Sequence, residues 1–276
     1  MENIQRALDL AAKQRAAHAH VHSRPHAEDP ATAERSAVRR EFTAAPIEPA
    51  TRLAVDWNAL RAGRIVDQDD ARPAAQAYRM LRTQVLQRAR AHGISTIGIV
   101  SAVNGEGKTL TAINLSLGLA AEPNQSVLLI DLDLRRPAVA KMLRLPVDRG
   151  LESWFAGTAT VEELWHGVAG VDRLFLLPTL APVPASSEAL ARATTKQLLQ
   201  DLKERDPGRI LIVDLPPVLL SDDALTLAPQ LDAVVLVVAE GRTRREDVAR
   251  VLELLGNTRV IGTVLNQSSE SETRAY

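Results

Sequence analysis

The chain has 276 residues, a formal net charge of −1 at pH 7 and no cysteine. Its length allows one large domain with extensions or two small ones, and its charge gives no whole-chain attraction to nucleic acid or anionic lipid. The absence of cysteine excludes disulfides, thiolate zinc sites and iron–sulfur clusters. No apolar run reaches transmembrane length, and MENIQRALDL lacks the apolar core of a signal peptide, so we expect a cytoplasmic protein.

Residues 1–50 are expected to form a short helix and a flexible linker outside the folded domain. Apolar positions, mostly alanine, recur at helical spacing in residues 1–17. Residues 18–50 hold few large apolar side chains, too few to offset the entropy lost on ordering. Four histidines cluster in this linker: His18, His20, His22 and His26. Such a cluster can bind metal, but no carboxylate scaffold supports it, and the composition favours a solvated linker.

The folded domain is expected over residues 51–268 and contains an arginine-rich helix over residues 74–91. Four side chains share one face at helical spacing: Tyr78, Leu81, Val85 and Leu86. Four arginines lie largely off that face: Arg79, Arg82, Arg88 and Arg90. The arginine surface is either solvated or a protein–protein contact, because arginine forks recognise carboxylates well.

A phosphate-binding loop is predicted where the strand Ile97–Val100 gives way to a helix. Its sequence is SAVNGEGKT, in which the glycines let successive N–H groups converge on phosphate oxygens. The helix N-terminus adds a partial positive charge, Lys108 would reach the β- and γ-phosphates, and the Thr109 hydroxyl can ligate Mg²⁺. The opening glycine of the motif is replaced by Ala102. The predicted nucleotide-binding residues here are Asn104, Gly105, Glu106, Gly107, Lys108, Thr109 and Leu110.

Four further aliphatic segments are predicted to be strands, and they alternate with helical stretches. The strands are residues 126–130, 209–213, 233–238 and 260–265, and the clearest helices are residues 195–203 and 245–255. Near-continuous aliphatic runs are typical of parallel strands covered on both faces. The pattern predicts a doubly wound, mostly parallel α/β sheet of the P-loop NTPase class. Residues 150–184 are expected to be helix and loop, with Trp154, Phe155 and Trp165 as core anchors.

Three aspartates follow the predicted strands on the side of the phosphate loop. Asp131, Asp133 and Asp214 stand at carboxyl ends of strands, where α/β sheets bind ligands. They can meet around Mg²⁺, which favours few carboxylates, waters and phosphate oxygens, and a nearby carboxylate can accept a proton from an incoming hydroxyl. We predict Lys108, Asp131 and Asp133 as catalytic residues, and Thr109, Asp131 and Asp214 as metal ligands. We expect Arg135 and Arg136 to contact phosphates or a neighbouring subunit, or to be solvated side chains at the surface.

The order SAVNGEGKT, VLLIDLDLRRP and ILIVDLPP, followed by Asp223-Ala224, resembles the bacterial tyrosine kinases of the CpsD and CapB type. These are P-loop ATPases that act with membrane chain-length determinants in exopolysaccharide synthesis. The likeness runs over residues 74–266, and the layout of the N-terminal segment is similar to that of exosortase-associated autokinases. It implies that Asp131 or Asp133 activates a tyrosine hydroxyl, that Asp214 acts through metal-bound water, and that Asn266 lies near the adenine.

The sequence departs from the family pattern at three places. Asn104 replaces a proline, and Gln76 replaces the glutamate of the oligomerisation motif E-x-x-R-x-x-R, whose arginines remain as Arg79 and Arg82. The C-terminal tyrosine cluster is reduced to Tyr276, at the end of a flexible tail over residues 269–276. In the family's scheme, subunits in a ring phosphorylate one another's tails, so the resemblance implies Tyr276 as phosphoacceptor.

The sequence therefore predicts an ATP- and Mg²⁺-dependent tyrosine autokinase that regulates exopolysaccharide polymerisation, chain length and export. The expected partners are further copies of the chain and the cytoplasmic part of a membrane chain-length determinant, which would place the protein at the inner face of the membrane. Two alternatives stay open: an ATPase switch without tyrosine phosphorylation, and a non-catalytic subunit that binds nucleotide and docks on a membrane protein. A partition ATPase of the MinD or ParA kind is disfavoured, because Val103 stands where those proteins carry a signature lysine.

Overall fold

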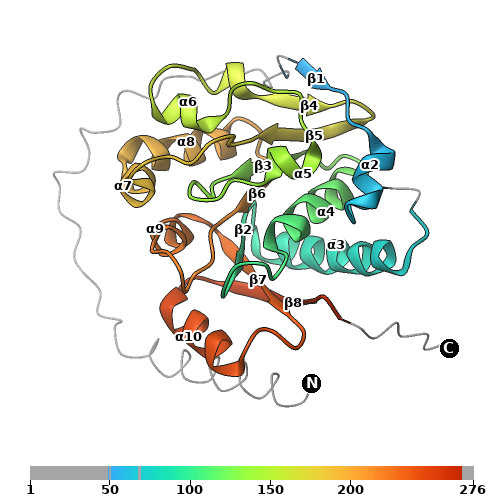
Figure 1. The fold of residues 1–276 in the computed structure, drawn as a ribbon, viewed down its shortest axis with the longest axis vertical. Coiled ribbons are helices and arrows are strands. Elements are labelled where there is room, and N and C mark those ends of the chain that lie inside the picture. Colours follow the sequence, from blue (N-terminus) through green and yellow to red (C-terminus); the bar gives the residue numbers. More distant parts are fainter. Residues whose placement is uncertain (1–48, 50, 68–69, 269–276) are drawn as a thin grey trace, which may run out of the picture. The chain divides into compact units, whose positions relative to one another are not determined.

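The structure is a computed structural model that describes residues 49, 51–67 and 70–268 (Figure 1). The predicted N-terminal helix, the histidine cluster, and the tail over residues 269–276 with Tyr276 lie outside the described residues. The chain divides into two units, residues 1–44 and 45–276, and the fold below belongs to the second. Within the described residues, no helix is both long and apolar enough to cross a membrane.

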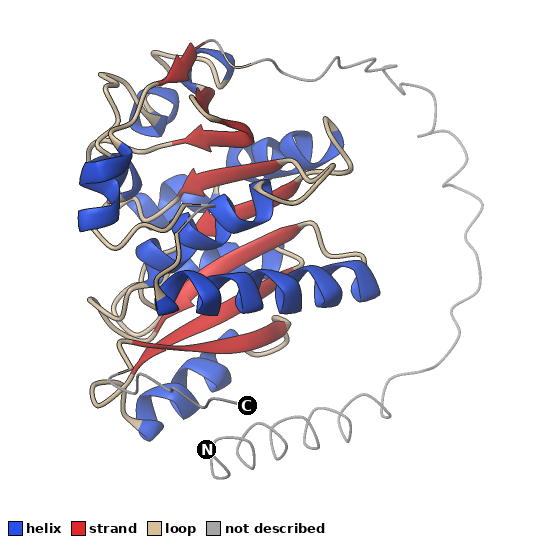
Figure 2. Ribbon diagram, turned by 90° about the vertical axis from the view of Figure 1, so that its right-hand side faces the viewer, coloured by secondary structure: helices blue, strands red, loops and turns tan. Residues whose placement is uncertain are grey.

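An eight-stranded sheet forms the centre of this unit, in the order β1-β4-β5-β3-β6-β2-β7-β8. The strands are β1 Thr51–Leu53, β2 Thr96–Ser101, β3 Val127–Asp131, β4 His166–Val168, β5 Val171–Leu177, β6 Ile210–Asp214, β7 Ala233–Ala239 and β8 Val260–Asn266. Only β4 and β5 pair antiparallel among the described strands. Because β1 pairs parallel to β4, these two strands run opposite to the other six. Figure 2 shows the strands side by side in one twisted sheet. The predicted mostly parallel sheet is confirmed.

Helices cover both faces of the sheet (Figure 1). The α-helices are α2 Trp57–Ala62, α3 Pro73–His92, α4 Lys108–Ala120, α5 Val139–Leu143, α6 Leu151–Phe155, α7 Ser186–Ala191, α8 Ala193–Glu204, α9 Asp223–Leu227 and α10 Arg245–Leu255, and the 3₁₀ turns are η2 Glu162–Leu164 and η3 Ala228–Gln230. The long helix α3 begins with proline at its first turn and ends at Gly93 in the left-handed conformation, as helix propensities favour. The helices predicted over residues 74–91, 195–203 and 245–255 are confirmed, with ends shifted by at most two residues.

The core lies on both sides of the central strands. Every residue of β2, β3, β6 and β7 is buried, as the aliphatic runs require for strands covered on both faces. Successive side chains point to opposite faces. Leu128 and Ile130 therefore join one apolar cluster, whereas Val127 and Leu129 join the other. This packing fixes the register that brings the ends of β2, β3 and β6 together.

The expectation of helix and loop over residues 150–184 is wrong where β4 and β5 lie. Strand β4 is only three residues long and contains Gly167, and the exposed pair Asp172–Arg173 interrupts the apolar pattern of β5. Both strands are stabilised by pairing with their neighbours in the sheet, a contact that local sequence does not reveal. The core anchors are confirmed, since Trp165 is fully buried and Trp154 and Phe155 pack against the same apolar cluster.

Candidate active site

The predicted phosphate loop links β2 to α4 at the carboxyl edge of the sheet. Gly105 and Gly107 have φ angles of 80° and 92°, a left-handed conformation that glycine adopts without strain. Gly107 is the N-cap of α4 and provides no side-chain oxygen to the first turn. The N–H groups at that helix end are therefore available to an anion, and the helix dipole favours one.

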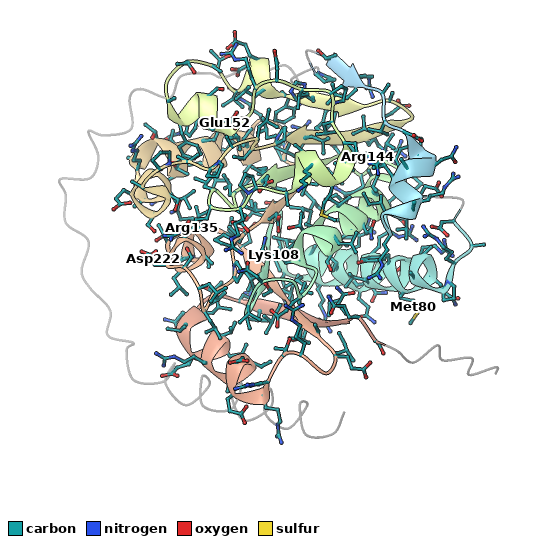
Figure 3. All side chains as sticks on the ribbon, in the orientation of Figure 1. Met80, Lys108, Arg135, Arg144, Glu152 and Asp222 are labelled. Atoms are coloured by element: carbon teal, nitrogen blue, oxygen red, sulfur yellow. The ribbon has the colours of Figure 1, made fainter. Side chains whose placement is uncertain are left out.

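Lys108, labelled in Figure 3, is buried among aspartates from the neighbouring strands. Its Nζ lies 2.7 Å from Oδ2 of Asp133 and 3.4 Å from Oδ1 of Asp214. The Thr109 hydroxyl donates to Oδ2 of Asp214 at 2.6 Å. Asp131 and Asp214 are register partners on β3 and β6, so the sheet itself brings these carboxylates together. The predicted residues of the loop and the strand ends thus form one cluster.

The carboxylates of this cluster share too little positive charge. Burial raises the pKa of Asp131 well above its usual range, and the nearby Asp214 raises it further. Burial also raises the pKa of Asp214, despite Lys108 and the Thr109 hydroxyl. Burial alone would lower the pKa of Lys108, but Asp214 and Asp133 outweigh it and raise the pKa. A divalent cation would relieve the repulsion among these carboxylates.

Asp131 and Asp133 differ in what they bind. Both oxygens of Asp131 accept backbone N–H groups: Oδ1 from Asp133 at 3.2 Å, and Oδ2 from Ala138 and Val139, each at 3.0 Å. Asp131 therefore holds the loop after β3 and the start of α5. Asp133 accepts the Arg136 N–H through Oδ1 at 3.0 Å and directs Oδ2 at Lys108. Sequence alone could not separate these two roles.

The donor set fits Mg²⁺ bound together with phosphate. Within the described part of the chain, no three Asp, Glu or His side chains group closely enough to hold a metal by themselves. The close pair of the Thr109 hydroxyl and the Asp214 carboxylate is a small set of oxygen donors at the phosphate loop. Mg²⁺ commonly takes one or two such protein oxygens and completes its shell with waters and phosphate oxygens. Asp131, Asp214 and Thr109 as metal ligands stay a prediction.

Two predicted nucleotide residues have other contacts in the loop. The Glu106 side chain is buried, accepts the Val103 N–H at 2.8 Å and receives the Thr243 hydroxyl. Only its backbone N–H is left to contact a nucleotide. Asn266 donates from Nδ2 to the Glu106 carbonyl oxygen at 2.8 Å. Asn104 and Leu110 are half-buried at the two ends of the loop, and Leu110 packs against the core.

Three residues that support the loop were not found from the sequence: Arg242, Thr243 and Gln267. Arg242 Nη1 and Gln267 Nε2 both donate to the Gly105 carbonyl oxygen, at 3.2 and 2.7 Å. They lie 137 and 162 residues from it along the chain. The only signal was their position just after two strands whose carboxyl ends face the loop.

Arg135 forms an ion pair inside the chain. Figure 3 labels it beside Asp222, and its guanidinium lies 3.1 Å from Oδ1 of the buried Asp223. Although burial raises the pKa of Asp223, hydrogen bonds from Arg135 and Ser187 hold it below its usual range. The contact joins the loop after β3 to α9. None of the predicted roles of Arg135 included this pair.

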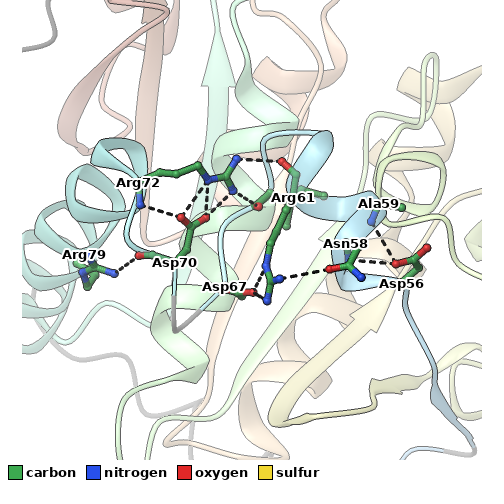
Figure 4. A network of polar contacts seen from close by, with 9 residues as sticks. Asp56, Asn58, Ala59, Arg61, Asp67, Asp70, Arg72 and Arg79 are labelled. Atoms are coloured by element: carbon green, nitrogen blue, oxygen red, sulfur yellow. Dashed lines mark hydrogen bonds and ion pairs between the residues drawn. The ribbon is translucent and has the colours of Figure 1, made fainter.

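The predicted oligomerisation residues lie on α3, and Figure 4 shows one of them, Arg79, beside a network of ion pairs. Arg79 Nη1 donates to the Asp70 carbonyl oxygen at 3.1 Å, and Arg82 Nε lies 2.9 Å from Oε1 of Glu122. Gln76 and Arg79 are exposed, whereas Arg82 is half-buried. A subunit contact through Gln76, Arg79 and Arg82 stays a prediction, and Arg82 would have to share its carboxylate partner.

Comparison with known proteins gives concordant matches. The model of the ParA family, described as NUBPL iron-transfer P-loop NTPase, matches residues 94–273. Tyrosine-protein kinase YwqD of Bacillus subtilis is 30% identical over 205 residues, which cover 73% of this chain and 84% of that protein. Succinoglycan biosynthesis transport protein ExoP of Rhizobium meliloti is 30% identical over 224 residues, which cover 78% of this chain but 28% of that protein. The kinase domain of the Escherichia coli tyrosine kinase ETK superposes with a TM-score of 0.66 at 25% identity, covering 76% of this chain and 81% of that one.

Proposed function

The chain belongs to the ParA family of P-loop NTPases and, within it, to the bacterial tyrosine-protein kinases, and from this membership we propose that it is an ATP- and Mg²⁺-dependent protein-tyrosine autokinase. The observation that carries the proposal is the cluster of Lys108 with Asp133, Asp214 and Thr109 beside the uncapped N-terminus of α4. This arrangement suits phosphoryl transfer, in which positioning and charge stabilisation supply nearly all of the catalysis.

In the proposed reaction, the loop N–H groups and Lys108 bind the phosphates of ATP. Thr109 and Asp214 would hold Mg²⁺, with Asp131 nearby, and the ion would neutralise phosphate charge. A tyrosine oxygen attacks the γ-phosphorus, the bond to the β,γ-bridging oxygen breaks, and ADP leaves. The phenolic proton passes to a carboxylate. Asp133 suits this role better than Asp131, because both oxygens of Asp131 hold backbone N–H groups, whereas Oδ2 of Asp133 faces Lys108, the side chain that would bind the phosphates.

The acceptor in this proposal is Tyr276, reached between subunits of a homo-oligomer. The chain has two tyrosines, and Tyr78 is half-buried on α3. The names of the relatives, tyrosine-protein kinase and succinoglycan biosynthesis transport protein, support a role in exopolysaccharide polymerisation, chain length and export. The further partner would be the cytoplasmic part of a membrane chain-length determinant, which would hold the protein at the inner face of the membrane.

Mass spectrometry after incubation with ATP and Mg²⁺ tests the proposal. We expect one phosphate on Tyr276 in the unchanged protein and none in Lys108→Ala or Tyr276→Phe. Tyr276→Phe should still hydrolyse ATP, whereas Lys108→Ala should not. ATP hydrolysis without phosphotyrosine, even with the cytosolic segment of a chain-length partner added, would refute the autokinase and favour the ATPase switch.

That switch is the second candidate, and the single tail tyrosine is the observation in its favour. The iron transfer in the family description is not proposed for this chain, which has no cysteine to bind iron through thiolates. A partition ATPase is also not proposed, because Val103 occupies the position of the signature lysine.

A further inference from the structure

Three side chains hold the phosphate loop from the ends of β7 and β8. Arg242 and Gln267 donate to the Gly105 carbonyl oxygen, at 3.2 and 2.7 Å, and Asn266 donates to the Glu106 carbonyl oxygen at 2.8 Å. We call Arg242, Asn266 and Gln267 the loop clamp. A fourth contact from the same side, the hydroxyl of Thr243 on the Glu106 carboxylate, holds the side chain of the loop rather than its backbone.

The clamp fixes the orientation of two peptide planes. In a trans peptide, the carbonyl of one residue and the N–H of the next point in opposite directions. The described chain has no cis peptide, so holding the carbonyls of Gly105 and Glu106 on the clamp side turns the N–H groups of Glu106 and Gly107 to the other side. Those are the N–H groups that a phosphate loop directs at its ligand. The clamp thus orients groups that it does not touch.

The clamp side chains also lie so close to the loop that they leave no room for a Cβ on Gly105 or Gly107. A Cβ on Gly105 would lie 2.8 Å from Arg242 Nη1, and a Cβ on Gly107 would lie 1.9 Å from Asn266 Nδ2. Glycine is required at both places because of the positive φ, and a side chain at either place would displace a clamp side chain. A shift of the loop away from the clamp would break these hydrogen bonds.

The clamp is continuous with the start of the tail. Asn266 is the last residue of β8, and its carbonyl oxygen accepts the Glu240 N–H at 2.9 Å. Gln267 follows with a φ of 57°, a conformation that non-glycine residues seldom adopt unless their surroundings hold them there. The segment with Tyr276 begins two residues later. Two of the three clamp residues, Asn266 and Gln267, thus come just before the segment that would be phosphorylated.

We propose that Arg242, Asn266 and Gln267 are positioning residues that hold the phosphate loop in its nucleotide-binding conformation, and that through Asn266 and Gln267 nucleotide binding is coupled to the C-terminal tail. The coupling to the tail rests on the proposed function. A nucleotide that stabilises the loop stabilises the clamp, and by reciprocity a change at the root of the tail alters nucleotide affinity.

Affinity for Mg²⁺-ADP tests the positioning role, since it needs no phosphoryl transfer. With a fluorescent methylanthraniloyl-ADP as probe, Gln267→Ala and Arg242→Ala should each weaken binding about 3- to 10-fold, the effect of one hydrogen bond. Arg242→Lys, which keeps a donor, should recover part of the loss. Matched controls are Gln197→Ala and Arg250→Ala, exposed residues of α8 and α10 that pair within their own helices. The melting temperature without nucleotide should stay within about 4 °C of that of the unchanged protein in all five variants, which shows that each variant folds.

Hydrogen exchange in the full chain tests the coupling. Mg²⁺-ADP should slow exchange in peptides covering residues 264–276 of the unchanged protein, and Gln267→Ala should remove most of that effect even at saturating nucleotide. Equal affinities in clamp and control variants, or exchange in the tail that ignores nucleotide, would overturn the inference and leave the kinase untouched. Failure of the unchanged protein to bind Mg²⁺-ADP would overturn both. Loss of Tyr276 phosphorylation with normal binding and exchange changes would count against the kinase alone.

Discussion

Aspartates stand at both ends of the central strands, in opposite electrostatic situations. At the carboxyl ends, Asp131 and Asp214 have pKa values raised above their usual range. At the amino ends, Asp232 accepts the N–H groups of Ser95 and Thr96 at 2.8 and 2.9 Å and lies 2.8 Å from Lys203 Nζ. Burial would raise the pKa of Asp232, but these donors lower it to about 2.

The difference lies in how deeply each carboxylate is buried and in how much positive charge lies beside it. Asp232 has a lysine to itself and fixes the start of β2, so its charge stabilises the fold. Asp133 and Asp214 share Lys108, and Asp131 lies close by, so the charges of Asp131 and Asp214 oppose folding there until a ligand supplies positive charge. Perturbed carboxylates of this second kind are typical of functional sites. The aspartate at the amino ends of the strands thus stabilises the fold, whereas the aspartates at the carboxyl ends belong to the candidate active site.

Asp214→Asn should give the largest effect, a loss of activity without a loss of stability. We expect autophosphorylation to fall by a factor on the order of 10²–10⁴, as for loss of one charge-stabilising group. The unfolding free energy without nucleotide should stay the same or rise, because one of three crowded carboxylates loses its charge. A raised carboxyl pKa costs stability as pH rises above about 4, so the gain should be greater at pH 7 than at pH 4. Autophosphorylation rates and urea unfolding of the same samples measure both.

The contrary result would be a loss of stability comparable to that of an ordinary buried ion pair. If Asp214→Asn lowered the unfolding free energy by about 3 kcal/mol or more, the cluster would be a structural ion pair rather than a site awaiting a ligand. Lys108→Gln provides the check, because it leaves the carboxylates without a cation and should destabilise the protein where Asp214→Asn does not.

Asp232→Asn should show the reverse pattern. Losing the charge-assisted bonds to Ser95, Thr96 and Lys203 should lower the unfolding free energy by about 1–2 kcal/mol, a figure reduced for the partial exposure of the pair. Nucleotide affinity and autophosphorylation should not change, because Asp232 precedes β7 at the end of the strand opposite the phosphate loop. Urea unfolding and the rate assay at pH 7 decide between the patterns. If the autophosphorylation rate of Asp232→Asn changed while its unfolding free energy did not, Asp232 would serve activity, and the proposed contrast between the two ends of the sheet would be wrong.

The residues at the carboxyl ends of the strands could be predicted from the sequence, whereas the role of Asp232 at the amino ends could not, for physical reasons. Gly105–Thr109 and the strand-end aspartates were predictable because their spacing lies within a single loop or strand, where local geometry fixes their direction. Asp232 is a single aspartate between two apolar segments, and its role depends on Ser95 and Lys203, which are distant along the chain. The same holds for the loop clamp, whose contacts span 137 to 162 residues. In both cases the role of a residue depends on contacts with residues far away along the chain, and local sequence patterns do not reveal such contacts.

The smallest effect concerns pH and separates charge from hydrogen-bond geometry at Asp232. Its pKa falls from about 3.8 to about 2 on folding, so its charge stabilises the protein fully above pH 4 and progressively less as pH falls towards 2. The stability difference between the unchanged protein and Asp232→Asn should therefore shrink by roughly half between pH 6 and pH 3. Urea midpoints across this range measure it, with Asp172→Asn, an exposed aspartate of β5, as control. A difference that stays constant would mean that an uncharged acceptor serves the start of β2 equally well. The contrast with the carboxyl ends would then rest on geometry instead of charge.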